Sequence, residues 1–393
     1  MRISVISFTA RGAELSRQMR SLPEPGMELS LYTKYKGLAG RKNCMESGAR
    51  VENWASEEYR GQEGTVRPGE TDLLQNEREL QEYDGVIPVS QSLSAWTREQ
   101  FEAKNAMLFI GACGIAVRAI APFLGDKLTD PPVLVMDEAG SFVIPVLSGH
   151  YGGANALARQ LAEKLGATAV ITTATDVNGL FAVDLFAKNN NLVICNRNGI
   201  EKVSSRVLEQ KAITMAIAGG RKGEPPKEVI IIPYPAQERV SVLVSPFQED
   251  AGSAELQLCP RAIVIGIGCR RGKTLPQIEA VLQKQVEKAN IRWEAISAIA
   301  SIDRKGEEEG LLELAEKYRL PFLTFSKEEL SKVTGEFQSS AFVQEQVGVD
   351  NVCERSAMAA SGRQGRLISE KYAEDGITIA IAAQDWRVIF DEA

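Results

Sequence analysis

The sequence predicts a multi-domain α/β protein, with two α/β domains of mostly parallel sheets joined by a smaller α+β middle domain. Buried apolar strands alternate with amphipathic helices in the first and last thirds of the chain. The length of 393 residues is enough for two to four domains. We place an N-terminal α/β domain at 1–175, a middle domain at 176–250, a linker at 251–260 and a C-terminal α/β domain at 261–393.

Composition narrows the class of protein. Apolar residues make up 44% of the chain and charged residues 25%, as in an ordinary globular protein rather than a disordered one. No apolar run approaches the ~18–20 residues of a membrane-spanning helix, which predicts no membrane partner. The six cysteines are scattered without a C-x-x-C pair, which favours reduced thiols and a cytoplasmic location. A net charge of −7 argues against a nucleic-acid partner.

The N-terminal domain is predicted from a series of strand and helix signals. An apolar strand opens the chain, and a clean buried strand runs into a glycine turn and a helix near residue 113. Two apolar runs around Asp137–Gly140 predict a hairpin. A polar, glycine-rich stretch at about 35–78 predicts loops and short helices. The expected elements are strands 3–8, 83–89, 106–111, 133–136, 141–146 and 169–172, and helices 13–22 and 154–165, the latter ending at Gly166.

The rest of the chain continues the alternation. The middle domain is expected to contain helices at 183–188 and 204–209 and strands at 212–218, 228–232 and 240–244. The C-terminal domain begins with a strand at 262–265 and a helix at 275–289, followed by further strands and helices up to Ile381.

The only histidine of the chain, His150, lies in the loop Ser148–Asn155 beside three glycines. A metal site built from several histidines is therefore impossible. Glycines let the backbone approach a flat ligand closely, and the following helix points its positive end back at the loop. An imidazole that titrates near neutral pH suits acid–base chemistry there. The alternative is that His150 only caps the loop by hydrogen bonding.

Two further segments follow predicted strands. Thr172–Asp176 comes after one strand, and Gly111–Arg118 comes after another and places Arg118 one turn into a helix. Since ligands bind at the carboxyl ends of strands in open α/β sheets, we expect these turns and the His150 loop to meet in one cleft. The alternative for Thr175 or Asp176 is a helix N-cap.

The loop Gly266–Thr274 contains Gly272-Lys273-Thr274 but fits neither the Walker A nor the dinucleotide pattern of glycines. A strand, a glycine turn and a helix N-terminus still favour anions, and Arg270 and Arg271 suit carboxylates. A structural turn with solvated basic residues is the alternative, and a nucleotide-dependent enzyme is a weaker one. Lys305 lies at the end of a later strand, before glutamates that suit a helix first turn.

These motifs, in this order, resemble the cobalt-precorrin-5A hydrolase family of anaerobic cobalamin biosynthesis. The resemblance covers nearly the full chain and is weakest at about 20–80 and 185–255, where the segment 37–80 is longer and more polar than in the family. The similar motifs are Gly114-Ile115-x-Val117-Arg118, Ala121-Pro122, Lys127-x-x-Asp130-Pro131, Leu147–Asn155, Ile171–Asp176, Gly266–Gly272, Ser301-x-x-x-Lys305-x-x-Glu308-x-Gly310-Leu311 and Val352-x-Glu354.

The resemblance implies a reaction. The substrate is a cobalt-containing, ring-contracted tetrapyrrole with a δ-lactone. Water opens the lactone, acetaldehyde is released, and cobalt-precorrin-5B is formed. Cobalt arrives with the substrate, so we expect no protein cofactor and no protein metal site.

The residues that match the family's motifs then receive expected roles. Water attack on a lactone needs a base and a stabilised oxyanion, for which His150 and the glycine-loop N–H groups are candidates. The expected catalytic residues are His150, Asp176 and Lys305. The expected substrate-binding residues are Gly114, Arg118, Lys127, Asp130, Gly149, Gly152, Gly153, Asn155, Thr173, Arg270, Arg271, Glu308 and Glu354.

The expected partner is the cobalt-corrinoid substrate. The sequence also leaves open contacts with other cobalamin-pathway enzymes and a homo-oligomer. A non-catalytic tetrapyrrole carrier is the competing function, and acetaldehyde release in a single turnover separates the two.

Overall fold

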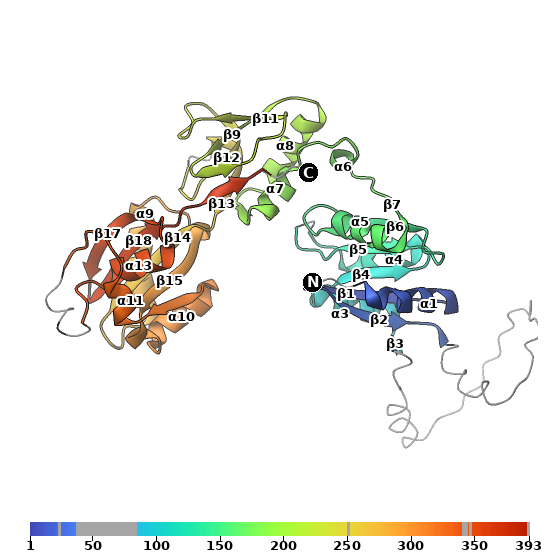
Figure 1. Ribbon diagram of the computed structural model, residues 1–393, viewed down its shortest axis with the longest axis horizontal. Coiled ribbons are helices and arrows are strands. Elements are labelled where there is room, and N and C mark those ends of the chain that lie inside the picture. Colours follow the sequence, from blue (N-terminus) through green and yellow to red (C-terminus); the bar gives the residue numbers. More distant parts are fainter. Residues whose placement is uncertain are drawn as a thin grey trace, which may run out of the picture. The chain divides into compact units, whose positions relative to one another are not determined.

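The computed structural model describes residues 1–22, 25–36, 85–126, 128–249, 252–339, 345 and 348–390. The chain divides into two compact units, Met1–Val177 and Asn178–Ala393 (Figure 1). The mixed α/β class with mostly parallel sheets is confirmed in both units. Within the described residues, no helix combines the length and the apolar character needed to cross a bilayer.

The N-terminal unit contains a seven-stranded sheet in the order β3-β2-β1-β4-β5-β6-β7. Strands β1 to β5 run parallel, β6 runs antiparallel to β5, and β7 runs parallel to β6. The strands are β1 (Arg2–Ser7), β2 (Glu28–Thr33), β3 (Val86–Pro88), β4 (Ala106–Ile110), β5 (Val133–Met136), β6 (Phe142–Leu147) and β7 (Thr168–Ala169).

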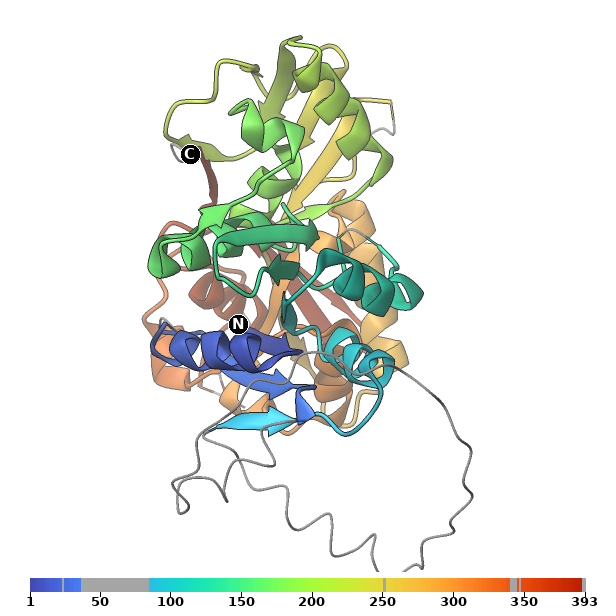
Figure 2. The same ribbon diagram turned by 90° about the vertical axis from the view of Figure 1, so that its right-hand side faces the viewer.

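Helices cover both faces of this sheet. Apolar residues of α1 (Ala10–Gln18) and α5 (Ala154–Leu165) pack on one side, and α1 is the dark blue helix of Figure 2. Residues of α3 (Leu93–Glu102) and α4 (Cys113–Ile120) pack on the other, around Trp96 and Phe109. A short helix, α6 (Ala174–Val177), closes the unit. Gly166 ends α5 in the left-handed conformation, with φ of 66°, as the sequence predicts.

The reversal of β6 corrects one expectation. Its pairing places Val133, at the start of β5, opposite Leu147, at the end of β6. The segments that follow β6 and β7 therefore lie at the edge where β4 and β5 begin, and Gly111–Arg118 lies at the opposite edge. The expectation that these turns meet in one cleft is wrong within this unit, because an antiparallel strand ends where its neighbour starts.

Two other expectations for this unit also change. The strand expected at 169–172 covers only Thr168–Ala169, and those two residues are not fully buried. The strand expected at 83–89 is observed as Val86–Pro88. The glycine-rich stretch at about 35–78 lies almost wholly outside the described residues.

The second unit begins with the predicted smaller middle domain. Its sheet has the order β11-β9-β12-β13-β8 and is parallel except between β13 and β8, which is closer to α/β than to the predicted α+β arrangement. The elements are α7 (Val183–Asn189), β8 (Leu192–Ile194), α8 (Asn198–Leu208), β9 (Ile213–Ile217), β11 (Val229–Ile232), β12 (Val240–Val244) and β13 (Ala254–Pro260).

The predicted linker at 251–260 is wrong, because most of it forms β13. Ala254, Leu256 and Leu258 alternate along the strand and are 3%, 0% and 1% exposed. The polar residues between them give the segment the composition of a linker. Apolar residues at every second position are nevertheless typical of a strand.

The C-terminal sheet has the order β16-β15-β14-β18-β17. Strands β14, β15 and β16 are parallel, whereas β18 and β17 are antiparallel to their neighbours. The elements are β14 (Ile263–Cys269), α9 (Leu275–Lys288), β15 (Ile296–Ile302), α10 (Glu309–Tyr318), β16 (Phe322–Phe325), α11 (Lys327–Ser331), α13 (Cys353–Ser361), β17 (Arg366–Glu374) and β18 (Ile377–Ala383).

The chain then returns to the middle domain. Strand β19 (Arg387–Ile389) pairs in parallel with β10 (Gly220–Lys222), and Phe390 stacks on Phe186 with ring centroids 5.1 Å apart. The last strand of the C-terminal domain predicted at 261–393 therefore pairs with a strand of the preceding domain and not with its own sheet. Gly219 permits this, since a Cβ there would lie 2.6 Å from the Trp386 ring.

Candidate functional site

The His150 loop is a tight turn after β6. Gly153 has φ of 92°, a left-handed conformation that favours glycine, and its N–H donates to the carbonyl of His150 at 3.0 Å. A Cβ on Gly152 would lie 2.3 Å from the Cβ of Ser148. The glycines thus fold the loop back on itself at the N-terminus of α5.

His150 is paired with Asp176 in the described structure. Its Nε2 hydrogen-bonds to Oδ2 of Asp176, and Oγ1 of Thr175 lies 3.1 Å from the same nitrogen. The two side chains are 15% and 12% exposed, so the pair lies near the surface rather than in the core. Because a carboxylate only accepts hydrogen bonds, Nε2 carries the proton, and in the neutral form of the ring the lone pair lies on Nδ1.

Two side chains of helix α5 also donate hydrogen bonds to the Asp176 carboxylate. Asn155 Nδ2 donates to Asp176 Oδ2 at 2.9 Å and to Thr173 Oγ1 at 3.0 Å. Arg159, one turn further along α5, donates from a guanidinium N–H to Asp176 Oδ1 at 2.6 Å. Burial alone would raise the pKa of the Asp176 carboxyl, but hydrogen bonds from Arg159, His150 and Asn155 hold that pKa below its ordinary value.

This arrangement is typical of a general base and its orienting carboxylate. Asp176 lies inside α6, and its carboxylate accepts from three side chains rather than capping the helix as the alternative would have it. Glycine at position 149 leaves room for the Asn155 side chain, since a Cβ there would lie 2.7 Å from the Asn155 amide oxygen.

The other predicted N-terminal residues divide between two edges of the sheet. Asp130 lies at the His150 edge, where its carboxylate accepts from the Gly125 N–H at 3.1 Å and its carbonyl accepts from Ser148 Oγ at 2.9 Å. Gly114 and Arg118 lie on α4, whose start is at the opposite edge, and the Arg118 guanidinium donates to the Gly114 carbonyl at 3.3 Å. Lys127 lies outside the described residues.

A second polar cluster lies in the C-terminal sheet, where the parallel strands β14 and β15 end. Glu308 accepts from the Gly272 N–H at 2.5 Å and from Lys305 Nζ at 2.7 Å. Glu308 and Lys305 are 10% and 18% exposed. Burial would raise the pKa of the Glu308 carboxyl, but Lys305, the Gly272 N–H and Arg271 hold it below its ordinary value.

Arg270 and Arg271 of the same loop are exposed. The backbone N–H of Arg270 donates to the Gly376 carbonyl at 2.8 Å, which fixes the loop against the β17–β18 turn. In the part of the chain that the structure describes, neither guanidinium has a hydrogen-bond partner, so both are available for carboxylates of a ligand.

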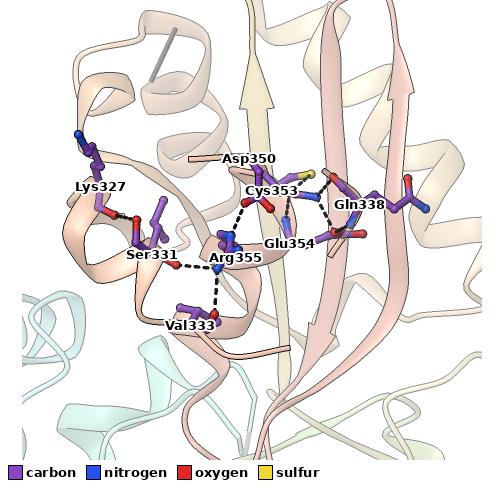
Figure 3. A network of polar contacts seen from close by, with 10 residues as sticks. Lys327, Ser331, Val333, Gln338, Asp350, Cys353, Glu354 and Arg355 are labelled. Atoms are coloured by element: carbon purple, nitrogen blue, oxygen red, sulfur yellow. Dashed lines mark hydrogen bonds and ion pairs between the residues drawn. The ribbon is translucent and has the colours of Figure 1, made fainter. Parts of the chain in front are cut away.

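Glu354, by contrast, is engaged by the protein itself. It is 1% exposed, and its carboxylate accepts from the backbone N–H of Gln338 at 2.9 Å (Figure 3). The backbone N–H of Lys371, at 2.6 Å, and the Asn351 amide also donate to it. The guanidinium of the next residue, Arg355, donates hydrogen bonds to the Asp350 carboxylate and to the Val333 carbonyl. These contacts are those of a carboxylate that holds a loop to α13 and β17.

Arg159 was not among the residues that the sequence singled out, and Thr175 was named only within Thr172–Asp176 and as a possible helix N-cap. The signal for Arg159 was its spacing, because residues four apart on a helix share one face, and Asn155 was already a candidate. Nothing in the sequence indicated that Thr175 contacts the imidazole. Among the described residues, no cluster of three or more His, Cys, Asp or Glu side chains could bind a metal.

Three protein-family models match consecutive parts of the chain. They are described as cobalamin synthesis G N-terminal at 95–176, cobalamin biosynthesis central region at 181–260, and cobalamin synthesis G C-terminus at 263–382. The first ends at Asp176, so it contains the entire His150 site.

Curated proteins are similar over most of the chain. A cobalt-precorrin-5A hydrolase from Salmonella typhimurium is 37% identical over 308 residues, which cover 76% of this chain and 87% of that protein. A cobalt-precorrin-5A hydrolase from Priestia megaterium is 34% identical over 303 residues, covering 72% and 80%. A Methanocaldococcus jannaschii protein named as a probable enzyme of the same kind is 28% identical over 299 residues, covering 72% and 86%.

Proposed function

Because the chain belongs to the cobalt-precorrin-5A hydrolase family, we propose that it opens the δ-lactone of cobalt-precorrin-5A with water and releases acetaldehyde, giving cobalt-precorrin-5B. The protein is thus a hydrolase of cobalamin biosynthesis. The observation that carries the proposed chemistry is the His150–Asp176 pair, held by Asn155 and Arg159 at the N-terminus of α5.

In the proposed first step, His150 acts as general base. Asp176 fixes the ring with the proton on Nε2, and Nδ1 takes a proton from the attacking water. The hydroxyl adds to the lactone carbonyl, and N–H groups of the glycine loop stabilise the oxyanion. The ester C–O bond then breaks, and the protonated imidazole returns the proton to the leaving oxygen.

The proposed second step breaks a carbon–carbon bond. The new hydroxyl loses its proton, acetaldehyde departs, and the electron pair passes into the conjugated macrocycle, as in a retro-aldol cleavage. The macrocycle of the substrate thereby serves as the electron sink, and Asp176 keeps His150 oriented to accept the hydroxyl proton.

The C-terminal cluster supplies binding in this proposal. The substrate bears several carboxylates, and Arg270 and Arg271 are exposed cations that can pair with them. Lys305 is paired with Glu308 at 2.7 Å, which favours an electrostatic role for it over proton transfer. Gly114 and Arg118 would bind substrate only at a sheet edge away from His150.

We further propose that the cobalt enters with the substrate and that the chain uses no cofactor of its own. Dialysis against a chelator, followed by assay with intact cobalt substrate, should leave acetaldehyde release unchanged.

The proposed setting is the cytoplasm, with the corrinoid as the partner. Contacts with other enzymes of the pathway, and a homo-oligomer, are tested by size-exclusion chromatography with light scattering.

One experiment decides between enzyme and carrier. The protein is mixed with cobalt-precorrin-5A at a single turnover, and acetaldehyde is measured together with the mass of the corrinoid. Stoichiometric acetaldehyde and a ring-opened product support the hydrolase. Tight binding of the lactone without acetaldehyde would favour the carrier.

A further inference from the structure

The Arg159 side chain is hydrogen-bonded to one residue of the protein and is otherwise largely exposed. A single N–H of its guanidinium donates to Asp176 Oδ1 at 2.6 Å. Its side chain is nevertheless 54% exposed, whereas the Asp176 side chain is 12% exposed. Among the described residues, Arg159 has no second hydrogen-bond acceptor. A guanidinium has five N–H donors in a planar fork, so most of them face solvent beside the His150–Asp176 pair.

The proposed reaction creates an anion at this place. Water adds to the lactone carbonyl, the ester C–O bond breaks, and the neutral lactone becomes an alcohol and a carboxylate, with one proton released. That carboxylate forms beside Asp176, which is itself held in its ionised form by its hydrogen bonds. Two carboxylates side by side repel each other unless a cation lies between them.

We propose that Arg159 binds the carboxylate that lactone opening creates, while one of its N–H groups continues to hold Asp176. This inference rests on the proposed hydrolase function and adds to it a residue that recognises the ring-opened state. Because the lactone group itself is neutral and becomes a carboxylate only on opening, the contact with Arg159 strengthens as the C–O bond breaks. It therefore favours the opened product over the substrate.

A role confined to positioning Asp176 makes a different prediction. Loss of Asp176 alignment would slow the reaction but would weaken lactone and product binding equally, since neither contact involves Arg159. The discriminating quantity is the ratio of the two affinities. Measuring it requires a protein that turns over too slowly to convert the lactone during a titration, so His150→Ala is the background for all variants.

The test compares Arg159→Met and Arg159→Lys, each with His150→Ala, by equilibrium titration with cobalt-precorrin-5A and with cobalt-precorrin-5B. Arg159→Met should weaken product binding by about 10- to 100-fold, the value of a charge-assisted hydrogen bond, and lactone binding by less than about 3-fold. Arg159→Lys keeps the charge without the fork and should fall between. Lys164→Met, an exposed cation later on α5, is the control and should change neither affinity.

An unchanged ratio of product to lactone affinity in Arg159→Met would overturn the proposal, whether both affinities fall or neither does. If that variant fails to fold, the Lys variant decides in the same way, with an unchanged ratio again refuting the contact. The proposed hydrolase function fails separately, through absence of acetaldehyde from the wild-type protein. The two failures are thus distinguishable.

Discussion

Replacing Asp176 by asparagine perturbs the site at its centre with almost no change in shape. The carboxylate accepts from His150 and Asn155 on Oδ2 and from Arg159 on Oδ1. An amide has only one accepting oxygen. Whichever way it turns, its NH2 group faces a donor, so at least one of these hydrogen bonds is lost.

The magnitude follows from those contacts. A lost hydrogen bond to a charged group costs about 1.5–3 kcal/mol, and the 54% exposure of Arg159 reduces this to about 1–2 kcal/mol. For a unit the size of Met1–Val177 this lowers Tm by about 2–8 °C. Activity should fall much further, by roughly 10²–10⁴, because the imidazole loses its fixed tautomer and orientation.

The assay is single-turnover acetaldehyde release by Asp176→Asn, with thermal unfolding measured in parallel. The single histidine adds a direct probe, since its imidazole NMR signals report only on this site and should shift at constant pH. Glu163→Gln, an exposed carboxylate on α5, is the matched control and should behave as wild type. An Asp176→Asn protein that releases acetaldehyde within about 3-fold of the wild-type rate would refute the reasoning.

Three further predictions test other parts of the structure. Gly149→Ala places a Cβ 2.7 Å from the amide oxygen of Asn155, so acetaldehyde release should fall by about 10- to 100-fold, and a wild-type rate would contradict the close approach. Phe390→Ala removes the ring stacked on Phe186 and should cost about 3 kcal/mol in urea unfolding, whereas an unchanged midpoint would mean that the last strand is not docked. The pKa of Glu308 is held low in the folded state, so its ionised form stabilises the protein above the ordinary carboxyl range, and this stability is lost as pH falls through the folded-state pKa. Glu308→Gln should therefore be destabilised near neutral pH and converge on wild type only once the pH has fallen below the folded-state pKa of Glu308. A constant difference at all pH values would count against this ion pair.

The sequence predicted most of the elements that carry the two clusters, because their signals are local. The hairpin around Asp137–Gly140, the helix that ends at Gly166 and the strand that precedes the Gly266–Thr274 loop are all present. His150 follows β6 and Asp176 follows β7, and these two strands run parallel to each other. Their neighbouring ends bring the two residues together.

The failures come from information that is not local. The predicted hairpin already required β6 to run backwards, which separates the His150 loop from Gly111–Arg118, but the expectation of one shared cleft treated all strands as parallel. Strand β19 was missed because its partner β10 lies far away in the chain. The buried position of Glu354 depends on the backbone N–H groups of Gln338 and Lys371 and on the Asn351 amide, and no sequence pattern records those contacts.

The central claim is that the single imidazole of this chain activates the water that opens the lactone. Its most direct test is His150→Ala mixed with cobalt-precorrin-5A, with the ring-opened corrinoid followed by mass over time. The account predicts lactone opening slowed by roughly 10²–10⁴ relative to wild type, with substrate still bound. Lactone opening at the wild-type rate in that variant would contradict it.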